Sequence, residues 1–180
     1  MITKTIPLNT ERLLLRKITM DDIEPMYNNW ASDDDVTRFL NWSTHQNIEV
    51  TRHVVSSWIN QYNHDYFFQW IIEHKDNKEV LGTISLFNRK EDSYEIGYCI
   101  SKKYWNQGIT SEACRAVLNF AFTELNVKSI YSRHVAENIA SGRVMQKNNM
   151  RFIGSSNEYI PSKSNLVIMN KYIITREEFK

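Results

Sequence analysis

The segment from residue 94 to residue 100 alternates strictly between apolar and other residues, the pattern of a strand with one buried face. One face carries Tyr94, Ile96, Tyr98 and Ile100. The other face carries Glu95, Gly97 and Cys99. Glycine inside a strand has no side chain to pack, so Gly97 indicates a bulge or a close approach by another backbone or a ligand.

A long helix is predicted directly after this strand, because apolar residues then recur at a spacing of three and four positions and end near Asn126. Its apolar stripe contains Ala113, Ala116, Val117, Phe120 and Ala121. We expect Thr110 or Ser111 to cap its start. The one glycine between strand and helix, Gly108, marks the turn from one to the other.

The remaining pattern predicts a chain of mixed strands and helices without repeats or linkers. Strands are expected over residues 8–18, 67–73, 80–87, 130–135, 151–154 and 166–175. Helices are expected over residues 21–31, 47–62 and 138–148, with a short one from Asp33 to Phe39. In helix 47–62 we expect Val50 to face the core and Thr51 to face solvent. Asp33, Asp34 and Asp35 are interpreted as a helix start, with attraction of a cationic amine as the alternative.

Composition limits the classes of function. A chain of 180 residues with 42% hydrophobic content forms one domain, 1–180, with a sizeable core. Its 22 basic and 21 acidic residues give a net charge of +1, so nucleic acid and membrane are not expected partners. The start resembles no signal peptide, and two cysteines indicate reduced core thiols, so we expect a cytoplasmic protein. The five histidines show no spacing typical of a metal site.

The turn between strand and helix is the first candidate for chemistry. Unpaired N–H groups and the positive end of a helix dipole bind phosphate or pyrophosphate well. An ordinary strand-turn-helix corner would carry the same pattern, so the turn alone does not decide between the two.

Three motifs in order decide the interpretation. They are Glu95-Ile96-Gly97-Tyr98, then Tyr104-Trp105-Asn106-Gln107-Gly108-Ile109-Thr110-Ser111-Glu112-Ala113, then Asn138-Ile139-Ala140-Ser141 with Arg143-Val144. With them the chain resembles the GNAT superfamily of acetyl-CoA-dependent N-acetyltransferases, in its RimJ/RimL-like branch, over nearly its whole length. Two positions depart from the usual phosphate turn, Trp105 and Thr110, and Met145 stands where many members have a tyrosine proton donor.

The resemblance implies a GNAT fold of the α/β (α+β) class. Its central sheet is mixed and mostly antiparallel, opens between two adjacent parallel strands, and has helices on both faces. It also implies acetyl-CoA as co-substrate and no metal. The implied cofactor-binding residues are Tyr98, Cys99, Ile100, Trp105, Asn106, Gln107, Gly108, Ile109, Thr110, Ser111, Asn138, Ser141 and Arg143.

Two catalytic residues follow from the same resemblance. Glu95 would take the proton from the acceptor amine, directly or through water, with a structural salt bridge as the alternative role. Ser141 would stabilise or protonate the leaving thiolate, and backbone N–H groups around Tyr98 to Ile100 would bind the oxyanion. Asn138 would hold the pantetheine arm, or would only cap its helix.

The predicted function is acetyl transfer to a primary amine, either a protein N-terminus such as that of a ribosomal protein or a small molecule. A non-catalytic module that binds acyl-CoA is the alternative. The acceptor itself is not specified by these residues, and either a monomer or a homodimer is compatible with them.

Overall fold

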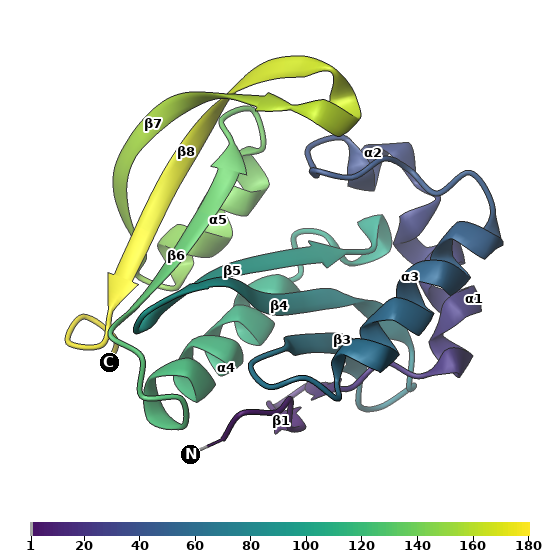
Figure 1. Ribbon diagram of the computed structural model, residues 1–180, viewed down its shortest axis with the longest axis horizontal. Coiled ribbons are helices and arrows are strands. Elements are labelled where there is room, and N and C mark those ends of the chain that lie inside the picture. The colour runs from purple at the N-terminus through teal and green to yellow at the C-terminus, as the bar shows by residue number, and fades with distance from the viewer. Residues whose placement is uncertain (1) are drawn as a thin grey trace.

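The computed structural model describes residues 2–180, which form one eight-stranded sheet with helices on both faces (Figure 1). The strands are β1 (Leu8–Asn9), β2 (Leu13–Arg16), β3 (Phe68–His74), β4 (Val80–Lys90), β5 (Ser93–Ile100), β6 (Ser129–Val135), β7 (Arg151–Ile160) and β8 (Asn165–Thr175). The α-helices are α1 (Ile23–Met26), α2 (Asp34–Thr37), α3 (Ile48–Gln61), α4 (Ile109–Thr123) and α5 (Ile139–Lys147).

The sheet has the strand order β1-β2-β3-β4-β5-β6-β8-β7. Every neighbouring pair is antiparallel except β5 and β6, which are parallel and joined through α4. Parallel neighbours need a long connection, and a helix packed on the sheet supplies it. The predicted fold class, mixed and mostly antiparallel with one parallel pair, is confirmed.

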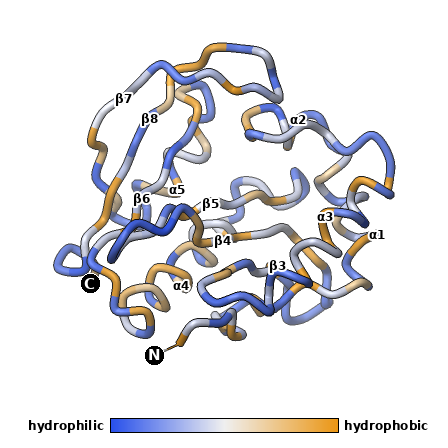
Figure 2. The backbone as a smooth tube through the Cα atoms, in the orientation of Figure 1, coloured by the Kyte–Doolittle hydropathy of each residue, from blue (hydrophilic) through white to orange (hydrophobic). Residues whose placement is uncertain are grey.

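Two hydrophobic clusters cover the two faces of the sheet. On one face α4 packs its predicted apolar stripe, and the ring of Phe120 meets Phe68 and Trp70 edge-on at centroid distances of 5.6 and 5.5 Å. On the other face α1 and α3 pack around the fully buried Trp30. Figure 2 shows the apolar residues gathered along the central strands and α4, and polar residues along the connecting loops.

The first predicted strand was wrong in one respect, because residues 8–18 form a hairpin of β1 and β2 and not a single strand. Leu8 pairs with Leu15 across it. The hydroxyl of Thr10 closes the turn by accepting a hydrogen bond from the Leu13 backbone N–H at 2.9 Å. A local side-chain bond of this kind competes with strand continuation.

The strand predicted over residues 151–154 continues to Ile160. Its second half, Ser155 to Tyr159, is polar and alternates weakly. Pairing with β8, from Arg151 opposite Ile173 to Ile160 opposite Asn165, is what holds it extended. The connection between β7 and β8 is therefore only a short turn after Ile160.

The predicted faces of helix α3 were wrong at its N-terminal end. Val50 is 40% exposed, while Thr51 is fully buried together with Val55. Thr51 tolerates burial because its hydroxyl lies 2.8 Å from Nδ1 of the buried His45. Further along, Val54, Trp58 and Ile59 pack on the core.

Candidate active site

The sheet opens between β5 and β6, as the resemblance to the GNAT superfamily implied. The two strands pair only from Ser93 opposite Ser129 to Glu95 opposite Tyr131. Beyond that point β5 continues to Ile100 and β6 to Val135 without pairing to each other (Figure 1). The result is a wedge whose vertex lies at Glu95 and Tyr131, and one strand edge on each side of it is left without a partner strand.

The backbone of β5 presents alternate residues to this wedge. The carbonyl of Ile96 accepts a bond from the Ser132 hydroxyl of β6 at 3.1 Å, so residue 96 points toward the wedge. The N–H of Ser101 donates to Leu81 beside β4 at 2.8 Å, so the odd positions point away. Since direction alternates along a strand, Tyr98 and Ile100 offer their N–H groups to the wedge, and the N–H of Cys99 faces β4.

No bulge lies at Gly97, contrary to one of the two expectations for it. Gly97 pairs regularly with Ser85, and the register shift between β4 and β5 lies further along, between Phe87 and Lys90. What approaches Gly97 is the ring of Phe87, since a Cβ at Gly97 would lie 2.8 Å from its Cε1 atom. The glycine therefore makes room for an aromatic side chain on the sheet face.

The turn between β5 and α4, residues 104–111, is called the phosphate-type turn below. Two of its residues have a left-handed backbone conformation. Asn106 and Gly108 both have positive φ, 60° and 77°. Helix α4 begins at Ile109 with Gly108 as its N-cap, so the expectation that Thr110 or Ser111 caps the helix was wrong. Among residues 2–180 no acceptor pairs with the backbone N–H groups of residues 106 to 111. These groups are available to an anion.

Side chains fix this turn to the end of β5. The indole Nε1 of Trp105 donates to the Ile100 carbonyl at 3.1 Å, and Gln107 Nε2 donates to the Lys103 carbonyl at 2.9 Å. Trp105 itself remains 40% exposed. Of the predicted turn residues, Ile109 is buried in the core. Trp105 and Ile109 therefore hold the turn in place, and the backbone between them offers the donors.

Helix α5 packs beside α4 and β6 and places Ser141 against Tyr98 of β5. Tyr98 Oη donates to the Ser141 carbonyl at 3.0 Å, and Ser141 Oγ donates to Tyr98 Oη at 3.3 Å. Burial raises the pKa of the Tyr98 phenol well above its ordinary value, so it stays a neutral donor. Asn138 caps α5 through its Oδ1, which accepts from the Ser141 N–H at 3.3 Å. Arg143 is exposed on the same helix.

Glu95 lies at the vertex with both carboxylate oxygens engaged. Its Oε1 accepts from Arg133 Nε at 2.7 Å, and its Oε2 accepts from Asn88 Nδ2 at 2.9 Å. The side chain is 15% exposed. Arg133 also binds Glu158 at 2.6 Å, and Glu158 binds Lys171 at 3.0 Å. A chain of charges therefore crosses the open part of the sheet.

Sequence reasoning missed Arg133 and Asn88. Arg133 follows Tyr131 at the strand period of two, which places it on the same face, but only the register of β5 with β6 brings it to Glu95. Phe87 and Tyr131 are the cross-strand neighbours of Glu95 on either side and are 38% and 39% exposed. The vertex is thus a carboxylate between two partly open aromatic rings.

The hairpin of β7 and β8 reaches over this face to the loop after α2. Ser43 Oγ donates to the Ser162 carbonyl at 3.1 Å, and Ser162 Oγ donates to the Asn41 carbonyl at 2.9 Å. A small cavity is lined by residues of both segments and of the loop after β6, among them Arg38, Lys163 and Glu137.

The three aspartates at the start of α2 have structural partners. Asp33 caps the helix by accepting from the Asp35 N–H at 2.8 Å. Asp34 accepts from the Thr44 hydroxyl at 2.5 Å, and Asp35 pairs with Lys102 at 2.5 Å. These contacts favour the helix-start interpretation over attraction of an amine.

The two cysteines lie apart, in β5 and in α4, and desolvation raises the pKa of each thiol to about 12. Neither is a thiolate at neutral pH. Among residues 2–180 no group of three His, Cys, Asp or Glu side chains is arranged to hold a metal ion. Within the same residues no helix combines the length and apolar character needed to cross a membrane.

Comparison with known proteins identifies relatives with the same architecture. A family model for an acetyltransferase (GNAT) domain matches residues 12–151. The chain is 30% identical over 171 residues to YoaA of Bacillus subtilis (strain 168), described as an uncharacterized N-acetyltransferase, covering 94% of this chain and 96% of YoaA. It is 27% identical over 152 residues to the ribosomal-protein-serine acetyltransferase of Escherichia coli (strain K12), covering 82% and 83%. A crystal structure of a GNAT-family acetyltransferase from Bacillus anthracis superposes with a TM-score of 0.85 at 29% identity, covering 96% and 100%.

Proposed function

The chain belongs to the acetyltransferase (GNAT) domain family, in its RimJ/RimL-like branch, and we propose that it transfers acetyl from acetyl-CoA to a primary amine by direct attack on the thioester. Acetyl-CoA-dependent acetylation is general to this family of enzymes, which favours catalysis over a module that only binds acyl-CoA. One observation carries the proposal at the level of the site. The sheet opens beside Glu95, and the turn that follows β5 holds a run of unpartnered N–H groups.

The residues around the wedge suit the parts of acetyl-CoA. The N–H groups from Asn106 to Ser111 would hold the pyrophosphate, since they gather at the start of α4. The free edge of β5, through Tyr98 and Ile100, would hold the pantetheine arm by strand-like hydrogen bonds. Asn138 uses its Oδ1 as a helix cap, which leaves its Nδ2 for the arm.

Glu95 is proposed as the base. As the amine nitrogen forms its bond to the thioester carbon and the carbon–sulfur bond breaks, the amine proton passes to the carboxylate, directly or through water. The ion pair with Arg133 and the hydrogen bond from Asn88 hold the carboxylate in place at the vertex. A carboxylate accepts up to about four hydrogen bonds, so two sites remain beside those used by Arg133 and Asn88. A purely structural carboxylate would make the same ion pair, and only substitution separates the two roles.

Ser141 is proposed as the donor to the departing thiolate, and Tyr98 or Ile100 as the N–H donor to the oxyanion. The Ser141 hydroxyl now points to Tyr98 and can turn toward the wedge without losing that partner, since the phenol O–H can donate to it in turn. The Tyr98 phenol keeps its proton throughout, because burial raises its pKa.

For the acceptor we propose the α-amine of a protein or peptide N-terminus beginning with serine. The similarity to the ribosomal-protein-serine acetyltransferase over 82% of the chain favours this choice. The second candidate, a small-molecule amine, rests on the cationic form of such amines and on the open aromatic and acidic vertex formed by Phe87, Glu95 and Tyr131.

The test is thiol release from acetyl-CoA with a panel of acceptors. The panel holds peptides beginning with Ser or Ala, polyamines and aminoglycosides, and each peptide is matched by the same peptide with a blocked N-terminus. Release with the free Ser peptide alone, and mass spectrometry showing one added acetyl group, supports the proposal. Thiol release only with small amines supports the second candidate. If no acceptor on the panel leads to thiol release, both candidates are contradicted.

A further inference from the structure

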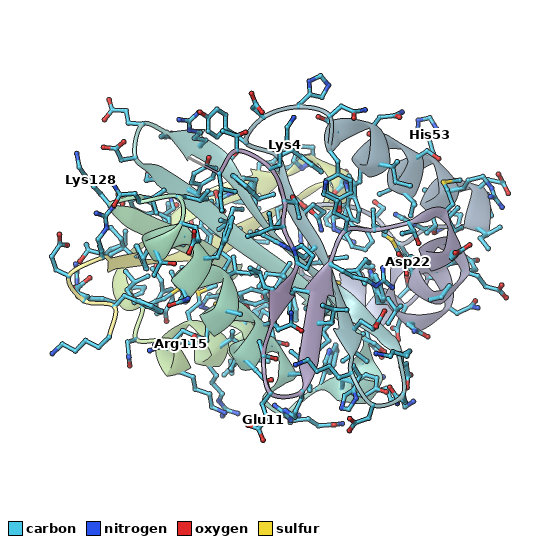
Figure 3. All side chains as sticks on the ribbon, turned by 90° about the horizontal axis from the view of Figure 1, so that it is seen from below. Lys4, Glu11, Asp22, His53, Arg115 and Lys128 are labelled. Carbon is cyan, nitrogen blue, oxygen red and sulfur yellow. The ribbon has the colours of Figure 1, made fainter. Side chains whose placement is uncertain are left out.

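Arg12, in the turn of the β1–β2 hairpin, is bound to the phosphate-type turn although the two lie 95 residues apart. Figure 3 shows this hairpin, whose tip carries the labelled Glu11, running alongside α4. Arg12 Nη1 donates to the Gln107 carbonyl at 3.0 Å, and its Nε donates to Glu112 Oε2 at 2.7 Å. One guanidinium therefore holds both the turn and the first turn of the helix.

The contact with Gln107 determines which way the next N–H group points. In a trans peptide the carbonyl and the following N–H point in opposite directions. Since Arg12 holds the Gln107 carbonyl on its own side, the N–H of Gly108 is turned to the opposite side. The guanidinium also lies against Gly108, where an added Cβ would be 3.5 Å from Arg12 Nη2. The position of Arg12 thus fixes a central N–H group of the turn in the direction away from Arg12.

Arg12 also balances the negative charge of Glu112. Glu112 lies in the first turn of α4, where its carboxylate would repel a bound phosphate. Its Oε1 accepts from the Arg12 backbone N–H at 2.9 Å and from the Thr10 hydroxyl at 2.6 Å. Burial acts to raise the pKa of Glu112, but the bonds from Thr10 and Arg12 outweigh it and lower the pKa below its ordinary value. The carboxylate is ionised, and the arginine beside it balances its charge.

We propose that Arg12 is a positioning residue for the pyrophosphate of acetyl-CoA, which orients the Gln107–Gly108 peptide and neutralises Glu112 without itself touching the ligand. The proposal rests on the proposed function, because it assumes that the turn holds the pyrophosphate. It differs from a merely structural role, in which the Arg12–Glu112 pair would join the hairpin to α4 and have no effect specific to the nucleotide half of the ligand.

The experiment compares Arg12→Ala and Arg12→Lys with the wild type. Arg16→Lys is the matched control, because Arg16 is on the same hairpin and makes similar ion pairs, with Asp22 at 2.8 Å and Glu73 at 2.7 Å, away from the turn. The Kd of CoA is measured by calorimetry. Turnover is measured with acetyl-CoA and with S-acetyl-pantetheine, a thioester that lacks the pyrophosphate. All measurements are made below the melting temperature of each variant.

We expect Arg12→Ala to weaken CoA binding by about 10- to 100-fold, the range for loss of a charge-assisted hydrogen bond. Arg12→Lys keeps the charge but cannot serve Gln107 and Glu112 together, so its loss should be intermediate. For the Arg12 variants kcat/KM should fall with acetyl-CoA and change by less than about 2-fold with S-acetyl-pantetheine. Arg16→Lys should lower the melting temperature and leave the Kd of CoA unchanged.

An unchanged Kd of CoA in Arg12→Lys and Arg12→Ala, or an equal loss of kcat/KM with both thioesters, overturns the proposal. If Arg12→Ala does not fold, Arg12→Lys alone decides by the same comparison. Wild-type protein that binds CoA but acetylates no amine contradicts the proposed function and leaves the Kd comparison valid. Wild-type protein that uses both thioesters with the same KM shows that the turn binds no pyrophosphate, which overturns the inference.

Discussion

Glu95→Gln separates a base from a structural carboxylate, because glutamine can keep most of the contacts of Glu95. Its oxygen can still accept from Arg133 Nε, now 2.7 Å from Oε1. Its NH2 group would face Asn88 Nδ2, and Asn88 can turn its amide so that the oxygen accepts instead. What is lost is the charge of a partly exposed ion pair, about 1 kcal/mol or less. We therefore expect a decrease in melting temperature of a few degrees at most.

The expected loss of activity is much larger. Removing a general base typically costs about 10²- to 10⁴-fold in rate, and the loss should fall on kcat/KM for the acceptor. The Kd of CoA should be nearly unchanged, since the base acts on the amine and not on the co-substrate. Thiol release at saturating acetyl-CoA and varied acceptor measures kcat/KM for the acceptor, and calorimetry measures the Kd of CoA.

Glu158→Gln is the matched control for this prediction. Glu158 binds the same Arg133, at 2.6 Å, but lies on β7 away from the vertex. Its substitution should affect stability to a similar extent and change kcat/KM by less than about 10-fold. Equal losses in the two variants, or a wild-type rate in Glu95→Gln at pH 7, would make Glu95 structural and would leave the base to a water chain or another group in the acceptor groove.

Three further changes test other parts of the site. Gly108→Val should abolish the thermal shift produced by acetyl-CoA, because its φ of 77° costs a residue with a Cβ about 1–2 kcal/mol and more if it is branched; an unchanged shift would refute the placement of the pyrophosphate. Asn149 has a φ of 60° after α5, so Asn149→Gly should be neutral or mildly stabilising and Asn149→Val should cost about 1 kcal/mol or more in urea unfolding, whereas equal stabilities would remove the inference. Ser141→Ala should lower turnover roughly 10- to 1000-fold with little change in acceptor KM. Tyr98→Phe keeps the serine hydroxyl and should lower turnover less. The reverse order would assign the role of thiolate donor to Tyr98.

Local sequence determined the elements and the conformations that individual residues impose. The alternation over residues 94–100 predicts only a strand, and the apolar stripe of α4 predicts only a helix. The reason is that side-chain direction follows a fixed period in each. Gly108 was assigned to the turn between strand and helix, and it has the positive φ that glycine adopts without a steric clash. The three motifs in order also identified the family, and with it the opening of the sheet between two parallel strands.

Local sequence failed where a distant partner decides the outcome. The hairpin at Leu8–Arg16, the length of β7 and the buried Thr51 each depend on a strand or side chain elsewhere in the chain. A polar segment such as Ser155–Tyr159 becomes a strand because β8 pairs with it, and a threonine is buried because His45 satisfies its hydroxyl.

The site shows the same division. The sequence supplied Glu95, Ser141 and the turn, but gave no sign that Arg133 engages Glu95, that Tyr98 engages Ser141, or that Arg12 holds the turn. Those contacts join residues 38 to 95 positions apart. The type and spacing of residues identify the groups that can react. Their charge balance, their hydrogen-bond partners and the orientation of a peptide depend on which segments the folded sheet brings within about 3 Å of one another.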